Sequence, residues 1–311
     1  MLEEGLCEIV LPARSQFTKE VALNVKAQLS AAGLLLLVAL AAPAGEADVP
    51  LLDAPESAYW DAGSDTWFVS NLGGGLSLAK DGVGWVTRFD AEGQVLAPRW
   101  ADGLDAPTGM ASHAGRLYVA DRGCVRIFDI ASAQPTGVVA LPGGEFVNDV
   151  AIAGDGAVFV SDTATNRIYR LTGDGAELWL ETDALQNPNG LWVDGAALVV
   201  ASWGPMTDVA TFAAKHPGTL LRIDLATKEI TPVGRGEPIA NFDGVLRIGE
   251  YYYATDWTGG RLLRIADDGS VETLLSGFSQ LADLGYDAKR GIVGLPIMSD
   301  NRFVRLRLTL P

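Results

Sequence analysis

The chain has 311 residues, of which 48% are hydrophobic, and its 23 basic and 39 acidic side chains give a formal net charge of −16. This hydrophobic share excludes a wholly disordered chain. The acidic balance argues against a nucleic-acid partner, because binding to a phosphate backbone needs clustered Lys and Arg side chains. Two cysteines, Cys7 and Cys124, and two histidines, His113 and His216, leave oxygen atoms as the ligands for any metal.

The N-terminal residues have features of an export signal. Residues 31–42 form an apolar run of twelve residues that is too short to span a membrane, and Ala42 and Ala44 suit cleavage before Gly45. The preceding segment is too long and too acidic for a leader, which indicates a misplaced start codon and a true start at Val25. We therefore predict that residues 1–44 are a signal peptide or a mis-assigned extension. The mature chain is then periplasmic or secreted and has no membrane span. The alternative is a cytoplasmic protein with an N-terminal amphipathic helix.

A short β-branched and aromatic strand recurs six times and ends in most copies in a small or acidic residue. The copies are residues 67–71, 117–121, 158–162, 198–202, 252–256 and 291–295. A second alternating strand follows each copy, at residues 85–90, 125–130, 167–171, 220–225, 261–265 and 302–308. Repeats of about 40 to 50 residues with several short antiparallel strands are typical of propeller blades. The sequence therefore predicts an all-β fold, a six-bladed β-propeller; a β-sandwich would not repeat in this way.

The last repeat stops at Pro311 after its third strand. We expect residues 46–52 to supply its fourth strand, so that the N-terminal strand pairs with the last blade and closes the ring. One propeller domain then spans residues 45–311. The two longest repeats indicate insertions at residues 73–84 and 204–218, which we expect on one face of the ring. They are either lids over the central opening or plain loop variation.

A polar residue recurs at the start of each inner strand, which in a propeller lines the central channel. The set is Glu56, Thr108, Asn148, Asn189, Asp243 and Asp283. Carboxylate and carboxamide oxygens that converge from several blades make a site for a hard cation. Ca²⁺ is favoured, Mg²⁺ and Mn²⁺ need stricter geometry, and Zn²⁺ is disfavoured because the set contains no His or Cys. The alternative is that these residues form turns and that water fills a polar channel mouth.

Other residues bear on the chemistry of the channel. Trp203 and Trp257 follow strand ends on the face of the inner oxygens, where they would suit an apolar or sugar-ring ligand or would pack between blades. The loop positions of His113 and His216 do not support a Ser-His-Asp triad. Asp149 and Asp283 are either candidates for proton transfer or structural residues.

The inner-strand set resembles the family of senescence marker protein, gluconolactonase and luciferin-regenerating enzyme, over residues 53–311. In that family a Glu, an Asn in Asn-Gly-Leu and an Asp in Asp-Gly hold one central divalent cation, and Glu56, Asn189 and Asp243 match them in order. Asn148-Asp149 resembles an Asn-Asp pair near the substrate and the metal. The resemblance implies a six-bladed propeller with Glu56, Asn148, Asn189 and Asp243 at the metal and Asn148 and Asp149 at the substrate.

We therefore expect a metal-dependent, Ca²⁺-type hydrolase of lactones or related esters, with a small-molecule substrate that Trp203 and Trp257 also contact. The cation would polarise the carbonyl, and the resemblance nominates Asp243 as the residue that assists attack by water. The alternative is a non-catalytic propeller that binds a small molecule or a protein around a structural metal. A phosphotriester or other ester hydrolase is a third possibility. The family's substrate-holding Arg has no counterpart near Ser112 or His113, which bears on the sugar substrate rather than on the metal.

Overall fold

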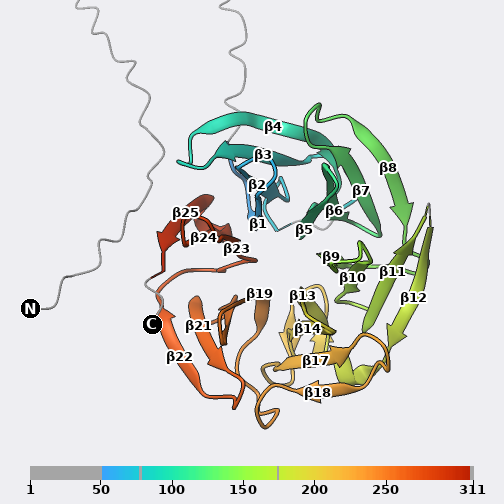
Figure 1. Ribbon diagram of the computed structural model, residues 1–311, viewed down its shortest axis with the longest axis vertical. Helices are drawn as coiled ribbons and strands as arrows, with labels where there is room; N and C mark the ends of the chain where they lie inside the picture. Colours follow the sequence, from blue (N-terminus) through green and yellow to red (C-terminus); the bar gives the residue numbers. More distant parts are fainter. Residues whose placement is uncertain (1–50, 77–78, 174, 309–311) are drawn as a thin grey trace, which may run out of the picture. The chain divides into compact units, whose positions relative to one another are not determined.

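Six antiparallel sheets follow one another along the chain and form a ring, with the first strand of each sheet toward its centre (Figure 1). The computed structural model describes residues 51–76, 79–173 and 175–308. Blade 1 contains β1 (Pro55–Asp61), β2 (Thr66–Asn71), β3 (Gly84–Asp90) and β4 (Val95–Leu104). Blade 2 contains β5 (Met110–His113), β6 (Arg116–Asp121), β7 (Cys124–Asp129) and β8 (Pro135–Ala140). Blade 3 contains β9 (Val147–Ile152), β10 (Val158–Asp162), β11 (Arg167–Thr172) and β12 (Gly175–Glu181).

The second half of the ring repeats this order with two differences. Blade 4 contains β13 (Pro188–Asp194), β14 (Ala197–Ser202), β17 (Leu220–Asp224) and β18 (Ile230–Pro232), with a hairpin of β15 (Met206–Asp208) and β16 (Ala213–Ala214) inserted after β14. Blade 5 contains β19 (Phe242–Ile248), β20 (Tyr251–Asp256), β21 (Arg261–Ala266) and β22 (Val271–Leu275). Blade 6 has three strands in the described residues, β23 (Gly285–Asp287), β24 (Ile292–Ile297) and β25 (Arg302–Arg307). The predicted six-bladed, all-β propeller is confirmed.

Helical structure is confined to two short 3₁₀ turns in the part of the chain that the structure describes. They are η1 (Asp183–Leu185), which precedes β13, and η2 (Met298–Asp300), which precedes β25. Within residues 51–308, no helix reaches the length and apolar character that a bilayer span requires. The predicted leader, residues 1–44, lies outside the described residues.

Blade 1 meets blade 6 through its inner strand. The backbone N–H of Ala58 donates to the Asp283 carbonyl at 3.2 Å, and the Asp283 N–H donates to the Glu56 carbonyl at 2.9 Å. Residues 46–50, which we expected in a fourth strand of this blade, lie outside the described residues, and Leu51 and Leu52 are not in a strand. Leu52 nevertheless belongs to the apolar cluster between these two blades.

An apolar cluster fills each boundary between neighbouring blades. The cluster between blades 1 and 2 contains Phe68, Trp100 and Leu117, and the other five boundaries are filled in the same way. The second strand of each blade is therefore covered on both faces, and all residues of β2 and β10 are buried. This double burial explains why apolar runs mark these strands in the sequence.

Four inner strands share a bulge at one position, where two of their residues oppose one residue of the second strand. The paired residues are Glu56 and Ser57 in β1, Asn148 and Asp149 in β9, Asn189 and Gly190 in β13, and Asp243 and Gly244 in β19. Three opposing residues carry a hydroxyl that accepts the N–H of the second bulge residue, at distances of 2.8–3.0 Å: Ser70, Ser161 and Thr255. A bulge changes the direction of the side chains that it contains, and here it does so at the predicted site residues.

The bulge hydroxyl of Ser161 provides a test of this arrangement. It accepts from Asp149 N at 3.0 Å and donates to the Asn189 carbonyl at 2.7 Å, so it connects blades 3 and 4. Ser161→Ala leaves two buried backbone groups unpaired, and we expect the free energy of unfolding to fall by about 1–3 kcal/mol in urea titrations. The control Ser299→Ala removes an exposed hydroxyl and should change it by less than about 0.5 kcal/mol. Equal stabilities of the two variants would contradict this role.

Candidate functional site

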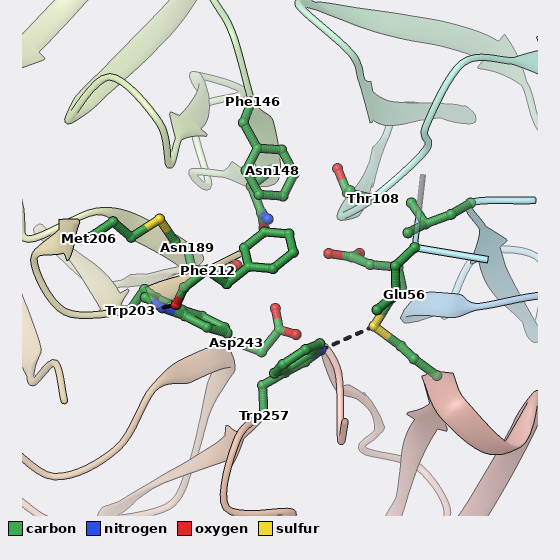
Figure 2. A pocket seen from close by; sticks show the side chains of 13 residues that line it. Glu56, Thr108, Phe146, Asn148, Asn189, Trp203, Met206, Phe212, Asp243 and Trp257 are labelled. Carbon is green, nitrogen blue, oxygen red and sulfur yellow. Dashed lines mark hydrogen bonds between the residues drawn. The ribbon is translucent and has the colours of Figure 1, made fainter. Parts of the chain in front are cut away.

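A cavity of about 450 Å³, which includes space open to solvent, lies where the inner strands begin. The polar part of its lining comes from blades 1 to 5, one residue from each: Glu56, Thr108, Asn148, Asn189 and Asp243. Figure 2 shows the carboxylates of Glu56 and Asp243 directed toward the middle of the cavity. The structure thus brings together five of the six residues that the repeat singled out, including the four predicted metal ligands.

The remaining described lining of this cavity is apolar. It consists of Leu72, Leu76, Phe146, Trp203, Met206, Phe212, Trp257 and Met298. Trp203 and Trp257 lie where the sequence placed them. Leu76 comes from the insertion at residues 73–84 and Phe212 from the insertion at residues 204–218, so both insertions reach the same opening. The sequence reasoning did not identify Phe146, Met206 or Phe212, and for the last two the insertion was the only signal.

Asp149 and Asp283 face a different cavity. This second cavity, of about 1000 Å³ including open solvent, is lined by later residues of the same inner strands. The Asp149 carboxylate accepts hydrogen bonds from Val150 N at 2.7 Å and Leu191 N at 2.6 Å. The structure does not bring Asp149 to the cavity of the predicted ligands, because it is the second residue of its bulge. His113 and His216 also lie outside the described lining of both cavities.

Burial and like charges determine the electrostatics of the channel. Burial raises the pKa of Glu56 well above its ordinary value, and the charges of Asp243, Asp283 and Asp149 raise it further. The pKa of Asp243 is likewise raised well above the usual range, mainly by burial and then by Asp283, while a hydrogen bond with Asn189 acts in the opposite direction. The channel therefore favours either protonation of these carboxyl groups or a nearby positive charge.

Three oxygen atoms in the first cavity are buried and have no hydrogen-bond partner in the protein: Glu56 Oε2, Asn189 Oδ1 and Asp243 Oδ1. Leaving such atoms unpaired is costly, more so for a charged group. They belong to three different blades and line one cavity, which is the donor set that a hard cation needs. Among the described residues, no group of three or more His, Cys, Asp or Glu side chains could hold a metal ion. A cation here would therefore depend on amide oxygens as well as on carboxylates.

Comparisons with known proteins bear on the fold. No protein-family model and no curated protein matches the chain. A gluconolactonase structure from Xanthomonas campestris is similar with a TM-score of 0.63 and 18% identity, covering 83% of this chain and 88% of that one. A streptogramin B lyase structure has a TM-score of 0.57 and 13% identity, with coverages of 85% and 96%. A structure of an inactive variant of virginiamycin B lyase from Staphylococcus aureus with quinupristin has a TM-score of 0.55 and 14% identity. The match covers 82% of this chain and 94% of that one.

These likenesses concern the fold, because the sequence identities are low. The resemblance to a gluconolactonase-like propeller is confirmed at that level. One of the similar structures is named a gluconolactonase and another a lyase. The propeller fold itself therefore does not assign a reaction. The assignment must come from the residues that line the cavity.

The raised pKa values predict how stability depends on pH. Burial raises the pKa of Asp283 from 3.8 to about 7, so between these values the folded chain binds more protons than the unfolded chain. The free energy of unfolding therefore falls as the pH rises through this window, and Glu56 and Asp243 act in the same direction. With a chelator present, we expect the Tm of the full-length chain to be roughly 5 °C lower at pH 8 than at pH 5.

A pair of variants separates this effect from the general charge of the chain. Asp283→Asn should reduce the fall in Tm between the two pH values. The control Asp224→Asn changes a half-exposed carboxylate whose pKa is lowered by hydrogen bonds from Thr227, and it should not reduce the fall. A chain that is equally stable at pH 5 and pH 8 would show that the buried carboxyl groups do not titrate as described.

Proposed function

We propose that the chain is a divalent-cation-dependent hydrolase of lactones or related esters, acting in the first cavity. The observation that carries this proposal is the convergence of buried, unpartnered oxygens from Glu56, Asn189 and Asp243 in one opening. Such a cluster is unfavourable on its own, and a bound cation relieves the cost. The likeness in fold to a gluconolactonase supports the proposal without carrying it.

The cation would be held by Glu56, Asn148, Asn189 and Asp243. Two carboxylates balance the charge of a divalent ion, and two carboxamides add neutral oxygens. Ca²⁺ accepts such a mixed and flexible set, whereas Mg²⁺ and Mn²⁺ require a stricter octahedron. No His or Cys is among the described lining residues, which disfavours Zn²⁺. A cation at this position would also lower the pKa values that burial raises.

The chemistry that a bound divalent cation supplies is polarisation of the ester carbonyl and stabilisation of negative charge on its oxygen. Asp243 accepts the proton of the water that attacks the carbonyl carbon. It then returns this proton to the ring oxygen as the carbon–oxygen bond breaks, so that lactone and water give a hydroxy acid. Burial holds the pKa of the Asp243 carboxyl above its ordinary value and a bound cation would lower it, so the group can both accept and return a proton. The N–H groups of the Asn148 carboxamide can bind a substrate oxygen, and the apolar wall limits the access of other water.

The alternative from a different class is a non-catalytic propeller that binds a small molecule around a structural cation. It uses the same four residues and differs only in the absence of turnover. An open cavity beside Asp243 suits both functions, because a binding site and an active site each need access, so turnover of a lactone is the measurement that separates them.

Conservative variants test both the site and the reaction. In calorimetric titrations of the chelator-treated full-length chain with Ca²⁺, Glu56→Gln and Asp243→Asn each remove one negative charge, and we expect at least about tenfold weaker binding. Asp243→Asn should also lower kcat for lactone hydrolysis, followed as proton release, by about 10²–10⁴-fold. The matched control is Asp268→Asn, an exposed change in the same blade, which should leave both quantities unaltered.

Two outcomes would refute parts of the proposal. Unchanged Ca²⁺ affinity in Asp243→Asn would show that the cation does not bind at these residues. Normal Ca²⁺ binding without hydrolysis of any lactone would favour the non-catalytic alternative.

A further inference from the structure

The apolar wall of the first cavity is an aromatic cluster with Phe212 at its centre. The ring centroid of Phe212 lies 5.8 Å from Trp203, 6.0 Å from Trp257 and 6.0 Å from Phe146. Trp203 and Trp257 are themselves 5.4 Å apart. Figure 2 shows this cluster beside the carboxylates of Glu56 and Asp243, so a substrate held at the polar residues also meets the aromatic rings.

The polar groups of this wall are already used within the protein. The indole N–H of Trp203 donates to the Phe212 carbonyl at 3.0 Å, and that of Trp257 donates to the Met298 sulfur at 3.1 Å, the dashed line of Figure 2. Behind the wall, the Asn241 carboxamide donates to the Trp203 carbonyl at 2.8 Å. Apart from the polar residues, the described side chains that line this cavity therefore offer a substrate no free hydrogen-bond donor.

We infer that this cavity selects lactones or esters that carry a hydrocarbon chain and rejects polyhydroxylated sugar lactones, with Phe212 as the specificity-determining residue. The inference rests on the proposed function and specifies its substrate class. A sugar hydroxyl that enters the wall loses its water without gaining a partner. A hydrocarbon chain loses no hydrogen bond there and gains burial against four rings.

Phe212 lies in the turn of the inserted hairpin, between β15 and β16. Its φ of +55° is in the left-handed region, which bulky residues rarely adopt. The Trp203 indole N–H donates to the Phe212 carbonyl, and the Asn187 side-chain oxygen accepts Met206 N at 2.8 Å at the base of the hairpin. This turn conformation places the Phe212 ring in the lining of the cavity.

The other insertion adds a further apolar side chain to the cavity. Leu76, from the other insertion, lines the same cavity and is 46% exposed. A chain that leaves the aromatic cluster can therefore contact a further apolar side chain at the rim. This favours a flexible hydrocarbon substituent over a compact ring alone.

Three six-membered lactones that differ only in their substituents test the inference. δ-Valerolactone is the bare ring, δ-decalactone adds a pentyl chain, and D-glucono-δ-lactone adds hydroxyl groups. For the full-length chain with Ca²⁺, we expect kcat/KM for δ-decalactone to exceed that for δ-valerolactone by at least about tenfold, with the sugar lactone lowest. Phe212→Ala should reduce the value for δ-decalactone about tenfold and that for δ-valerolactone less than about threefold.

Matched variants separate specificity from folding. Phe212→Leu keeps an apolar side chain and should retain most of the preference. Phe303→Ala truncates another half-buried ring, which contacts Trp67 and Phe89 between blades 1 and 6, and it should leave the ratio of the two kcat/KM values unchanged. Binding of 2-pentylcyclopentanone, a ketone that cannot be hydrolysed, is measured in parallel by tryptophan fluorescence and should weaken in Phe212→Ala.

The outcomes distinguish this inference from the proposed function. Hydrolysis of the sugar lactone as efficient as that of δ-decalactone overturns the inference and leaves the lactonase proposal intact. If no lactone is hydrolysed, the proposed function fails and the ketone decides the inference. Weaker ketone binding in Phe212→Ala then supports an apolar subsite, and equal binding overturns it.

Discussion

The bulge in the inner strands is the constraint on which the candidate site depends. In a regular strand, neighbouring side chains alternate between the two faces of the sheet, and neighbouring blades cover both faces. The extra residue directs Glu56, Asn148, Asn189 and Asp243 into one end of the channel. In blades 1, 3 and 5 a side-chain hydroxyl accepts a hydrogen bond from the backbone N–H of the second bulge residue. Because the ring repeats this detail, residues far apart in the sequence meet without a dedicated loop.

The arrangement of the inner strands also brings several carboxyl groups close together near the axis. The packing of the blades opposes the repulsion between them. Glu56, Asp149 and Asp243 are buried and Asp283 is half-buried near the axis, and the pKa of each is raised. Repulsion between them would open a loosely packed ring. Each of the six blade boundaries has its own apolar cluster. Burial of these side chains offsets the free-energy cost of the carboxyl groups near the axis. Functional sites commonly tolerate such local instability.

The sequence predicted the parts of the structure that depend on burial and repetition. Strands such as β10 were identifiable because both of their faces are covered, whereas exposed outer strands such as β8 have no apolar pattern to find. The polar residue at the start of each inner strand was also identifiable, because it recurs in every repeat. The direction of Asp149 was not, because spacing alone does not reveal which residue of a bulge faces which cavity. Phe212 was also missed, because it lies in an insertion that no other blade repeats and its position depends on contacts of Trp203 and Asn187.

The two parts of the cavity therefore have different structural origins. The polar residues come from the repeating blades, so a change in one of them disturbs a position that the ring uses several times. Three of the eight apolar lining residues, Leu76, Met206 and Phe212, come from insertions, and Asn187 and Trp203 bond the second insertion to the ring. An insertion can change its side chains while the blade clusters stay intact. On this scaffold, the reaction would be determined by the repeat and the choice of substrate by the insertions, which is why proteins with the same fold and low identity need not share a substrate.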